Sequence, residues 1–363
     1  MKHKAPLILS LDAGGTNFVF YAVKGNKIIG EPIQKPSYAN NLNKSLQTIV
    51  EGFETLAEQQ PEPVAALSFA FPGPADYENG IIGDLGNLPA YRDGVALGPL
   101  LEEKFGIPVF INNDADLFAY GESICGCLPD LNNKLKATGS RKTYRNLVGL
   151  TLGTGFGLGV VNEGHLLRGD NSMPNEIWLM RNPEYPDANI EESISIRGIQ
   201  RSYRKLSGDK EFLTPKDIYE QAVHGIGKKQ QAALETYRIF GYNLGDTIAT
   251  LISLYDSNVV IGGGIAKAWD LFMPALIKQL NSEFITPEGK HMPRLTHQVY
   301  ALEDESNFKA FASGGEKQVA LPGKTEALYR YNHNPRVGIM KSALGTSQAV
   351  VTGAYHFALT KLV

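Results

Sequence analysis

The spacing of apolar residues predicts a chain that alternates strands with helices. Short apolar runs bounded by turn residues predict strands over 7–11, 18–23, 64–71 and 109–111. Apolar residues at helical spacing predict amphipathic helices over 46–57 and 95–105, and a further helix starting at Asp116. The first part of the chain is therefore expected to belong to the α/β class.

The second part of the chain repeats the opening pattern of strand, Gly/Thr turn and strand. The new strands are predicted over 147–152 and 158–161, about 140 residues after the first pair, which favours a duplicated domain over a solenoid repeat. A long helix is predicted over 234–255 and a strand over 258–261. The stretch 287–335 is the least regular, and we expect loops and an insertion there.

Composition narrows the function classes. The chain has 363 residues, is 43% apolar and 20% charged, and carries a formal net charge of −3. This composition excludes disorder as the main state, and the charge gives no footprint for nucleic acid or an anionic membrane. Apolar runs long enough to span a bilayer are missing, and Cys125 and Cys127 are too close together for an unstrained disulfide. We therefore expect a cytoplasmic protein.

Three glycine-rich turns, each after an apolar strand, point to anion binding. They are Asp12–Asn17, Gly153–Gly157 and Gly262–Gly264. Glycine lets backbone N–H groups approach a phosphate, and threonine adds a donor. The P-loop pattern is missing, and Lys267 stands where the Rossmann pattern needs its third glycine.

Two aspartates beside these turns are candidates for chemistry. Asp12 next to phosphate-binding amides suggests Mg²⁺, bound through water, although an ordinary turn residue is the alternative. Asp114 follows a strand and precedes a helix, so it is either an N-cap or a carboxylate that accepts a hydroxyl proton as a phosphoryl group leaves ATP.

Taken in order along the chain, the motifs resemble those of the ROK family of sugar kinases, within the actin and hexokinase fold superfamily. The matching segments are Asp12–Asn17, Phe71–Asp76 with Asn79-Gly80, Gly86–Pro89, Asn113–Asp116 with Gly121-Glu122, Leu152–Gly155 and Val260–Gly264. The resemblance implies an α/β, two-domain, ribonuclease H-like fold with an active-site cleft between the domains. We expect a small domain over 1–117, completed by a helix over about 349–363, and a larger domain over 118–348.

The resemblance also implies roles for single residues. Asp114 matches the catalytic base, and Asn87 and Asn113 match ligands of the sugar hydroxyls, while Gly73 lies in the loop that lines the sugar pocket. ATP and Mg²⁺ are the implied cofactors, with Asp12 near the metal. The implied nucleotide-binding residues are Gly14, Gly15, Thr16 and Asn17 in the first phosphate loop, Gly153, Thr154 and Gly155 in the second, and Gly262, Gly263 and Gly264 near the adenosine.

One segment departs from the family pattern. Asn175-Glu176-Ile177-Trp178-Leu179 stands where typical members have Gly-Glu-Ile-Gly-His followed by zinc-binding cysteines. Glu176 keeps the sugar-binding glutamate, Leu179 replaces the histidine, and no cysteine follows. We therefore expect no structural zinc here. Glu192 aligns best with the second sugar-contacting glutamate, with Glu191 one residue away. Trp178 could pack against a sugar face or fill the gap left by zinc.

The expected function is ATP-dependent phosphorylation of a hexose, glucose first, at its 6-hydroxyl. N-acetylhexosamine, mannose and fructose remain open as substrates. A silent sugar-binding sensor and an actin-like assembling ATPase are the alternatives from other classes. We expect a homodimer with small-molecule partners and no nucleic acid, since only 11 residues precede Asp12 and leave no room for the DNA-binding segment of the family's repressors.

Overall fold

The computed structural model describes residues 5–362, and the chain forms two compact units. The first unit comprises Met1–Gly126, Leu158–Glu176 and Ala343–Val363, and the second comprises Cys127–Gly157 and Ile177–Ser342. The domain limits expected from the sequence, 1–117 with 349–363 and 118–348, stay a prediction.

A five-stranded sheet forms the centre of the first unit. Its strand order is β3-β2-β1-β4-β8, with bounds Lys27–Pro36, Asn17–Lys24, Leu7–Ala13, Val64–Ala70 and Val109–Asn112. The first three strands are antiparallel neighbours, whereas β1, β4 and β8 run parallel. A small sheet of β5 (Ala75–Asp76), β6 (Ile81–Ile82) and β7 (Val95–Ala96) follows β4. The strands predicted at the start of the chain are confirmed.

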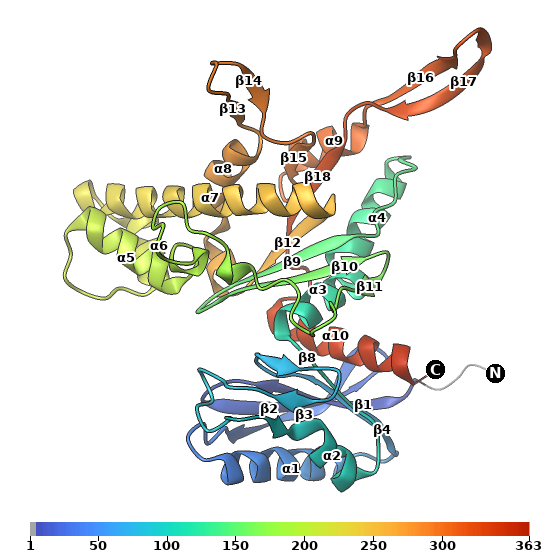
Figure 1. Cartoon of the computed structure of the whole chain (residues 1–363), viewed down its shortest axis with the longest axis vertical. Helices are drawn as coiled ribbons and strands as arrows, with labels where there is room; N and C mark the ends of the chain where they lie inside the picture. Colours follow the sequence, from blue (N-terminus) through green and yellow to red (C-terminus); the bar gives the residue numbers. More distant parts are fainter. Residues whose placement is uncertain (1–4, 363) are drawn as a thin grey trace. The chain divides into compact units, whose positions relative to one another are not determined.

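Helices cover both faces of this sheet (Figure 1). The helices α1 (Leu42–Glu58) and α2 (Leu97–Phe105) lie on one face, where Phe20, Phe53 and Phe69 pack into an aromatic core. The C-terminal helix α10 (Thr346–Lys361) covers the other face and packs against α3 (Asp114–Cys125). The strands β10 (Phe156–Asn162) and β11 (His165–Leu166) form a hairpin whose part from Leu158 onward belongs to this unit.

Glycine lets α3 and α10 approach closely. A Cβ at Gly121 would overlap the carbonyl oxygen of Ala349, and one at Gly353 would overlap that of Leu117. The backbones of the two helices therefore touch where α3 crosses α10. This contact fixes α3, whose first turn carries Asp114, on the sheet of the first unit.

A parallel sheet forms the centre of the second unit. Its strands lie in the order β9 (Leu147–Leu152), β12 (Asn258–Gly262), β18 (Arg336–Lys341) and β15 (Gln298–Ala301). The helices are α4 (Cys127–Ala137), α5 (Ile196–Ser207), α6 (Pro215–His224), α7 (Gly227–Tyr255), α8 (Trp269–Leu280) and α9 (Glu305–Ser313). Short 3₁₀ turns lie at Ile177–Leu179, Ile190–Glu192 and Gly264–Ala268.

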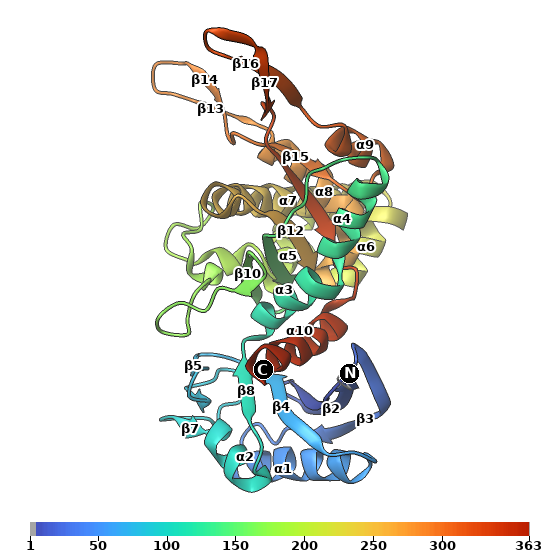
Figure 2. The same ribbon diagram turned by 90° about the vertical axis from the view of Figure 1, so that its right-hand side faces the viewer.

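The stretch 287–335 is regular, so the expectation of irregular loops was wrong. It contains β15, α9 and the hairpin of β16 (Glu316–Leu321) with β17 (Lys324–Asn332), and it completes the hairpin of β13 (Glu283–Ile285) with β14 (His291–Pro293). Figure 2 shows both hairpins extending away from the helices of this unit. Every residue of β16 is exposed, so no alternation between buried and exposed positions marks that strand in the sequence.

Across residues 5–362, every helix is too short or too polar to cross a lipid bilayer.

Candidate active site

The carboxyl ends of three parallel strands bring the predicted residues of the first unit together. In the sheet register, Asp12 at the end of β1 pairs with Ala70, and Ala70 pairs with Asn112 at the end of β8. The loop that contains Gly73 leaves the end of β4 at the same edge, and Asp114 follows β8. Ligands commonly bind at this edge of parallel sheets.

Asn113, rather than Asp114, caps α3. The Asn113 side-chain oxygen accepts a hydrogen bond of 2.8 Å from the N–H of Ala115, which also donates to Asp114 Oδ1 at 2.9 Å. The sequence pattern predicted that this helix starts at Asp116. It starts at Asp114 instead, because its N-cap, Asn113, lies three residues before Asp116. The Asp114 side chain is exposed, so its carboxyl group remains open to a substrate.

The carboxyl groups at this edge influence one another. Burial raises the pKa of Asp12, and the negative charge of Asp114 raises it further. Burial by the surrounding protein raises the pKa of Asp114, although the hydrogen bond from the Ala115 N–H lowers it. Sequence reasoning missed Asp116, which is only 8% exposed and whose pKa burial and the Asp114 charge raise to about 8. A carboxylate in the first turn of α3 carries no sequence signal that distinguishes it from a surface residue.

Tyr77 links the Gly73 loop to Asn113. Its hydroxyl donates to the carbonyl oxygen of Phe71 at 3.0 Å and accepts from Asn113 Nδ2 at 3.4 Å. A Cβ at Gly73 would lie 2.9 Å from the same hydroxyl, so a larger residue would displace it. Sequence reasoning also missed this buried tyrosine, because only the tertiary structure shows that it reaches two predicted sugar-binding segments.

The first glycine turn is tight and lies against the loop of Asn87. The Gly14 N–H donates to the carbonyl oxygen of Asn17 at 3.0 Å, and Ser37 closes the turn by donating from Oγ to the carbonyl oxygen of Gly15 at 2.6 Å. A Cβ at Gly15 would lie 3.1 Å from the carbonyl oxygen of Asn87. Thr16 is exposed at the tip of the turn, where its hydroxyl group is accessible.

Two further glycine turns lie at the carboxyl edge of the sheet in the second unit. β9 and β12 run parallel with Thr151 opposite Gly262, so 153–155 and 262–264 leave the sheet side by side. Gly263 has a φ of 91°, and a Cβ there would overlap the backbone of Leu152. This position therefore requires glycine. The structure thus brings the predicted second phosphate loop and the predicted adenosine loop together.

Glu191 and Glu192 have different environments. Glu191 Oε2 accepts a 2.8 Å hydrogen bond from the Phe156 N–H, directly beside Gly155, and Oε1 accepts one of 2.6 Å from Arg197. Glu192 pairs instead with Arg197 Nε at 2.7 Å and with Arg201. Glu191, the alternative in the sequence alignment, is therefore the residue that contacts the second glycine turn.

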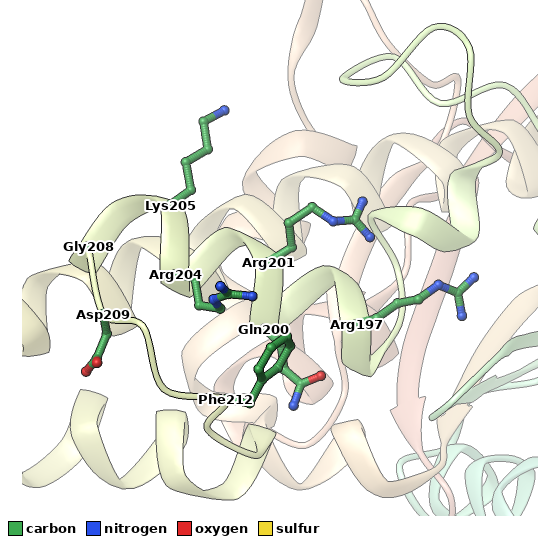
Figure 3. A pocket seen from close by; sticks show the side chains of 8 residues that line it. All are labelled: Arg197, Gln200, Arg201, Arg204, Lys205, Gly208, Asp209 and Phe212. Carbon is green, nitrogen blue, oxygen red and sulfur yellow. The ribbon is translucent and has the colours of Figure 1, made fainter.

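The helix α5 supplies the cations for these pairs. Figure 3 shows Arg197 and Arg201 extending in one direction from α5, away from Arg204 and Phe212. All four side chains line a cavity of about 430 Å³. The Arg204 guanidinium lies 4.3 Å from the centroid of the Phe212 ring. Arg197 also donates to the carbonyl oxygen of Thr154 at 3.2 Å, which holds α5 against the second glycine turn.

A buried asparagine holds the segment that carries Glu191. Asn182 is 0% exposed, and its side-chain oxygen accepts from the N–H groups of Glu184 and Tyr185 at 3.0 and 3.1 Å. Its amide group donates to the carbonyl oxygen of Asn189 at 3.0 Å and to Ser193 Oγ at 2.9 Å. These bonds cross-link the two ends of the loop. Trp178 and Leu179, the replacements in the zinc-motif position, are 37% and 58% exposed.

The sheet edge of the first unit carries a carboxylate, that of Asp12, of the kind that can bind a hydrated Mg²⁺ ion. Among the side chains that the structure describes, those of 5–323 and 327–362, no cluster of three or more His, Cys, Asp or Glu is arranged to hold a metal ion. Mg²⁺ is commonly bound by one or two carboxylates together with water and substrate phosphates. Asp12, half-buried beside the Gly14–Gly15 turn, supplies one such carboxylate, and a cation would offset the charge of Asp114 that acts on it.

The fold and the site define an α/β protein with glycine-rich turns at the ends of parallel strands. Residues 8–301 match the ROK family, so the chain belongs to that family. It is 46% identical to a glucokinase from Parabacteroides distasonis of known crystal structure, over 99% of this chain and 98% of that one, with a TM-score of 0.89. This likeness confirms the predicted fold class.

Two curated relatives cover most of their own length. The chain is 27% identical to the glucokinase of Thermotoga maritima over 301 residues, which is 77% of this chain and 88% of that protein. It is also 27% identical to the N-acetyl-D-glucosamine kinase of Vibrio cholerae over 294 residues, 76% of this chain and 89% of that protein.

Proposed function

We propose that this protein is an ATP-dependent sugar kinase that phosphorylates glucose at its 6-hydroxyl. Membership of the ROK family and the likeness to glucokinases over nearly the whole chain support the sugar kinase class. The observation that carries the chemistry is the exposed Asp114 carboxyl at the sheet edge where Asp12 and Asn113 also lie.

Asp114 is the proposed catalytic base. The oxygen of the sugar hydroxyl forms a bond to the γ-phosphorus of ATP, the bond from that phosphorus to the ADP oxygen breaks, and Asp114 accepts the hydroxyl proton. Asn113, Asn87 and Glu176 are proposed to orient the sugar, since the asparagine amides both donate and accept hydrogen bonds and a glutamate carboxylate accepts them. Gly73 keeps space open beside Tyr77, whose hydroxyl holds Asn113.

The glycine turns are the proposed nucleotide-binding groups. We assign phosphate binding to Gly14, Gly15, Thr16 and Asn17 and to Gly153, Thr154 and Gly155, and adenosine binding to Gly262, Gly263 and Gly264. Backbone N–H groups in such turns hold phosphate oxygens without side-chain interference. Asp12 is proposed to hold Mg²⁺ through water, and the ion supplies stabilisation of the charge on the transferring phosphate.

The second sugar-contacting glutamate is proposed to be Glu191 rather than Glu192. Arginines engage both oxygens of Glu192, whereas only one oxygen of Glu191 pairs with an arginine and the other accepts from the Phe156 N–H beside the glycine turn. Substituting each in turn separates them. Glu191→Gln should raise the KM for the sugar more than Glu192→Gln does, and an equal effect would return the assignment to Glu192.

Coupled ADP release across a panel of hexoses tests the proposed reaction. The panel contains glucose, N-acetylglucosamine, N-acetylmannosamine, mannose and fructose, and turnover is expected to be fastest with glucose. Asp114→Asn should lower kcat by about 10²–10⁴-fold and leave glucose binding measurable by calorimetry. A sensor would bind a sugar without turnover, and an assembling ATPase would release ADP regardless of sugar. Either result would overturn the proposal.

We also propose a cytoplasmic homodimer that binds no nucleic acid. Cys125 and Cys127 are too close together for an unstrained disulfide, which supports a reducing compartment, and the net charge of −3 disfavours a nucleic-acid partner. The β16–β17 hairpin supports the dimer, because Val319, Tyr329 and Tyr331 are 42%, 56% and 53% exposed on one of its faces. Light scattering of the full chain tests this, and a monomer at assay concentration would refute it.

A further inference from the structure

Asp116 is a buried carboxyl group for which the proposed reaction has no use. It is 8% exposed in the first turn of α3, two residues after Asp114, and its Oδ1 is buried without a hydrogen-bond partner. The strand β10 presses against this turn, since a Cβ at Gly159 would lie 2.8 Å from the Asp116 Cα. Water therefore cannot hydrate a charge on this group without displacing protein.

The charged groups around Asp116 disfavour its ionisation. The carboxylates of Asp114, in the same helix, and of Glu176, at the end of the 158–176 segment, both raise its pKa. The Arg168 guanidinium lowers it, but burial has the largest effect. The Arg168 guanidinium lies 5.3 Å from the centroid of the Phe357 ring on α10. In the loop that contains Gly73, burial raises the pKa of the Tyr77 hydroxyl, and the charge of Asp116 raises it further.

Asp114 and Asp116 are therefore unequal partners. Burial raises the pKa of Asp114, but this residue has an exposed surface and its Oδ1 accepts a backbone hydrogen bond that works in the opposite direction. Asp116 has neither solvent nor a donor at Oδ1. An ionised carboxylate in such a position costs several kcal/mol, and proteins avoid this cost by keeping the proton. Adjacent carboxyl groups with such different surroundings commonly divide into one acid and one base.

We propose that Asp116 is a positioning residue that remains a neutral carboxylic acid, and that its ionisation disorders the first turn of α3 and displaces Asp114. The inference deepens the proposed function and rests on Asp114 as the base. While Asp116 is neutral, the turn stays packed under β10 and holds Asp114 in place. Once Asp116 loses its proton, the turn must open to hydrate the new charge.

The pH profile of glucose phosphorylation tests this role. In the wild-type protein, kcat/KM should fall on the alkaline side with a midpoint at about pH 8, the pKa of Asp116. It should then fall about tenfold for each further pH unit, because the protonated fraction does. Asp116→Asn keeps the shape of the side chain but cannot ionise, so the ratio of activity at pH 9 to that at pH 7 should rise about tenfold.

Asp130→Asn is the matched control, because Asp130 is an exposed aspartate in the first turn of α4. It should keep the wild-type profile. Arg168→Gln provides a second test at a half-buried position: loss of the cation should move the alkaline midpoint of the otherwise wild-type protein to higher pH. An unchanged alkaline limb in Asp116→Asn, or an unmoved midpoint in Arg168→Gln, would overturn the proposal.

Thermal unfolding tests the same proton without any turnover. In the unfolded chain the carboxyl group of Asp116 returns to its ordinary pKa of 3.8. Between pH 3.8 and about pH 8 the unfolded state therefore binds fewer protons than the folded state. The free energy of unfolding of the wild type therefore falls as pH rises through this window, relative to Asp116→Asn. The Tm of the variant should exceed that of the wild type by a margin that widens from pH 5 to pH 8.

These readouts separate the two proposals. If no hexose is phosphorylated, the proposed function fails, while the Tm comparison still decides whether Asp116 holds its proton. An infrared carboxylic C=O band at pH 7 that is present in the wild type and missing in Asp116→Asn would confirm the neutral acid. A margin in Tm that stays constant from pH 5 to pH 8 would show that Asp116 is ionised and would refute the inference.

Discussion

Replacing Asn182 by alanine should destabilise the second unit, because this side chain holds together the loop that carries Glu191. The side chain is fully buried and hydrogen-bonds to four groups, the N–H groups of Glu184 and Tyr185, the carbonyl oxygen of Asn189 and the Ser193 hydroxyl. Each hydrogen bond contributes about 1 kcal/mol net. Alanine removes all of these hydrogen bonds, so the four partner groups lose the bond that Asn182 provided.

The full sum overstates the cost, because Glu184 is exposed and Tyr185 is half-buried, so water can reach their N–H groups. We therefore expect a loss of about 3 kcal/mol in the free energy of unfolding. For a unit of this size, that loss corresponds to a fall in Tm of about 6–12 °C. Circular dichroism melts with and without glucose measure it.

Asn132→Ala is the matched control within the same unit. Asn132 also cross-links a loop, but it makes only two such bonds, both to the backbone of Tyr144 at 2.9 Å. Its loss should cost about 1–2 kcal/mol. A fall in Tm for Asn182→Ala no larger than that for Asn132→Ala would refute the view that Asn182 holds the loop together.

Three further predictions follow from the site and the packing. Gly121→Val should prevent folding of the first unit, or lower its Tm by more than 10 °C, because the valine side chain would overlap the Ala349 carbonyl oxygen. Circular dichroism melts measure the change in Tm, and Ser123→Val on the same helix is the control. Asp12→Asn should raise the Mg²⁺ concentration for half-maximal activity about tenfold, which a Mg²⁺ titration at saturating ATP measures; an unchanged titration would remove Asp12 from the metal site. Zinc chelation followed by re-addition of Mg²⁺ should leave activity unchanged, whereas a loss restored only by zinc would reveal a site elsewhere.

The sequence by itself determined the local elements of this protein. Apolar periodicity located the strands at the start of both units and the helices α1 and α2, because burial on one face leaves a regular repeat. The ordered glycine turns, together with Asn113-Asp114, indicated a ROK sugar kinase, and the family match confirms this class. Such motifs are readable because they are contiguous.

The hairpins within 283–332 carried no such pattern. The strand β16 packs against no core, so neither of its faces is selected to be apolar throughout, and the edge strand β15 is too short for a periodic signal. Tertiary structure alone decided that this stretch is regular.

Only the tertiary structure decided which distant residues act together. Tyr77 reaches Asn113 across 36 residues, and Glu191 reaches Phe156 across 35. The burial of Asp116 likewise depends on β10 packing over α3. Hydrogen bonding and desolvation depend on distance in space, which a linear pattern does not record. The sequence therefore supplied the chemical groups, and the fold decided which of them are charged, exposed and in contact.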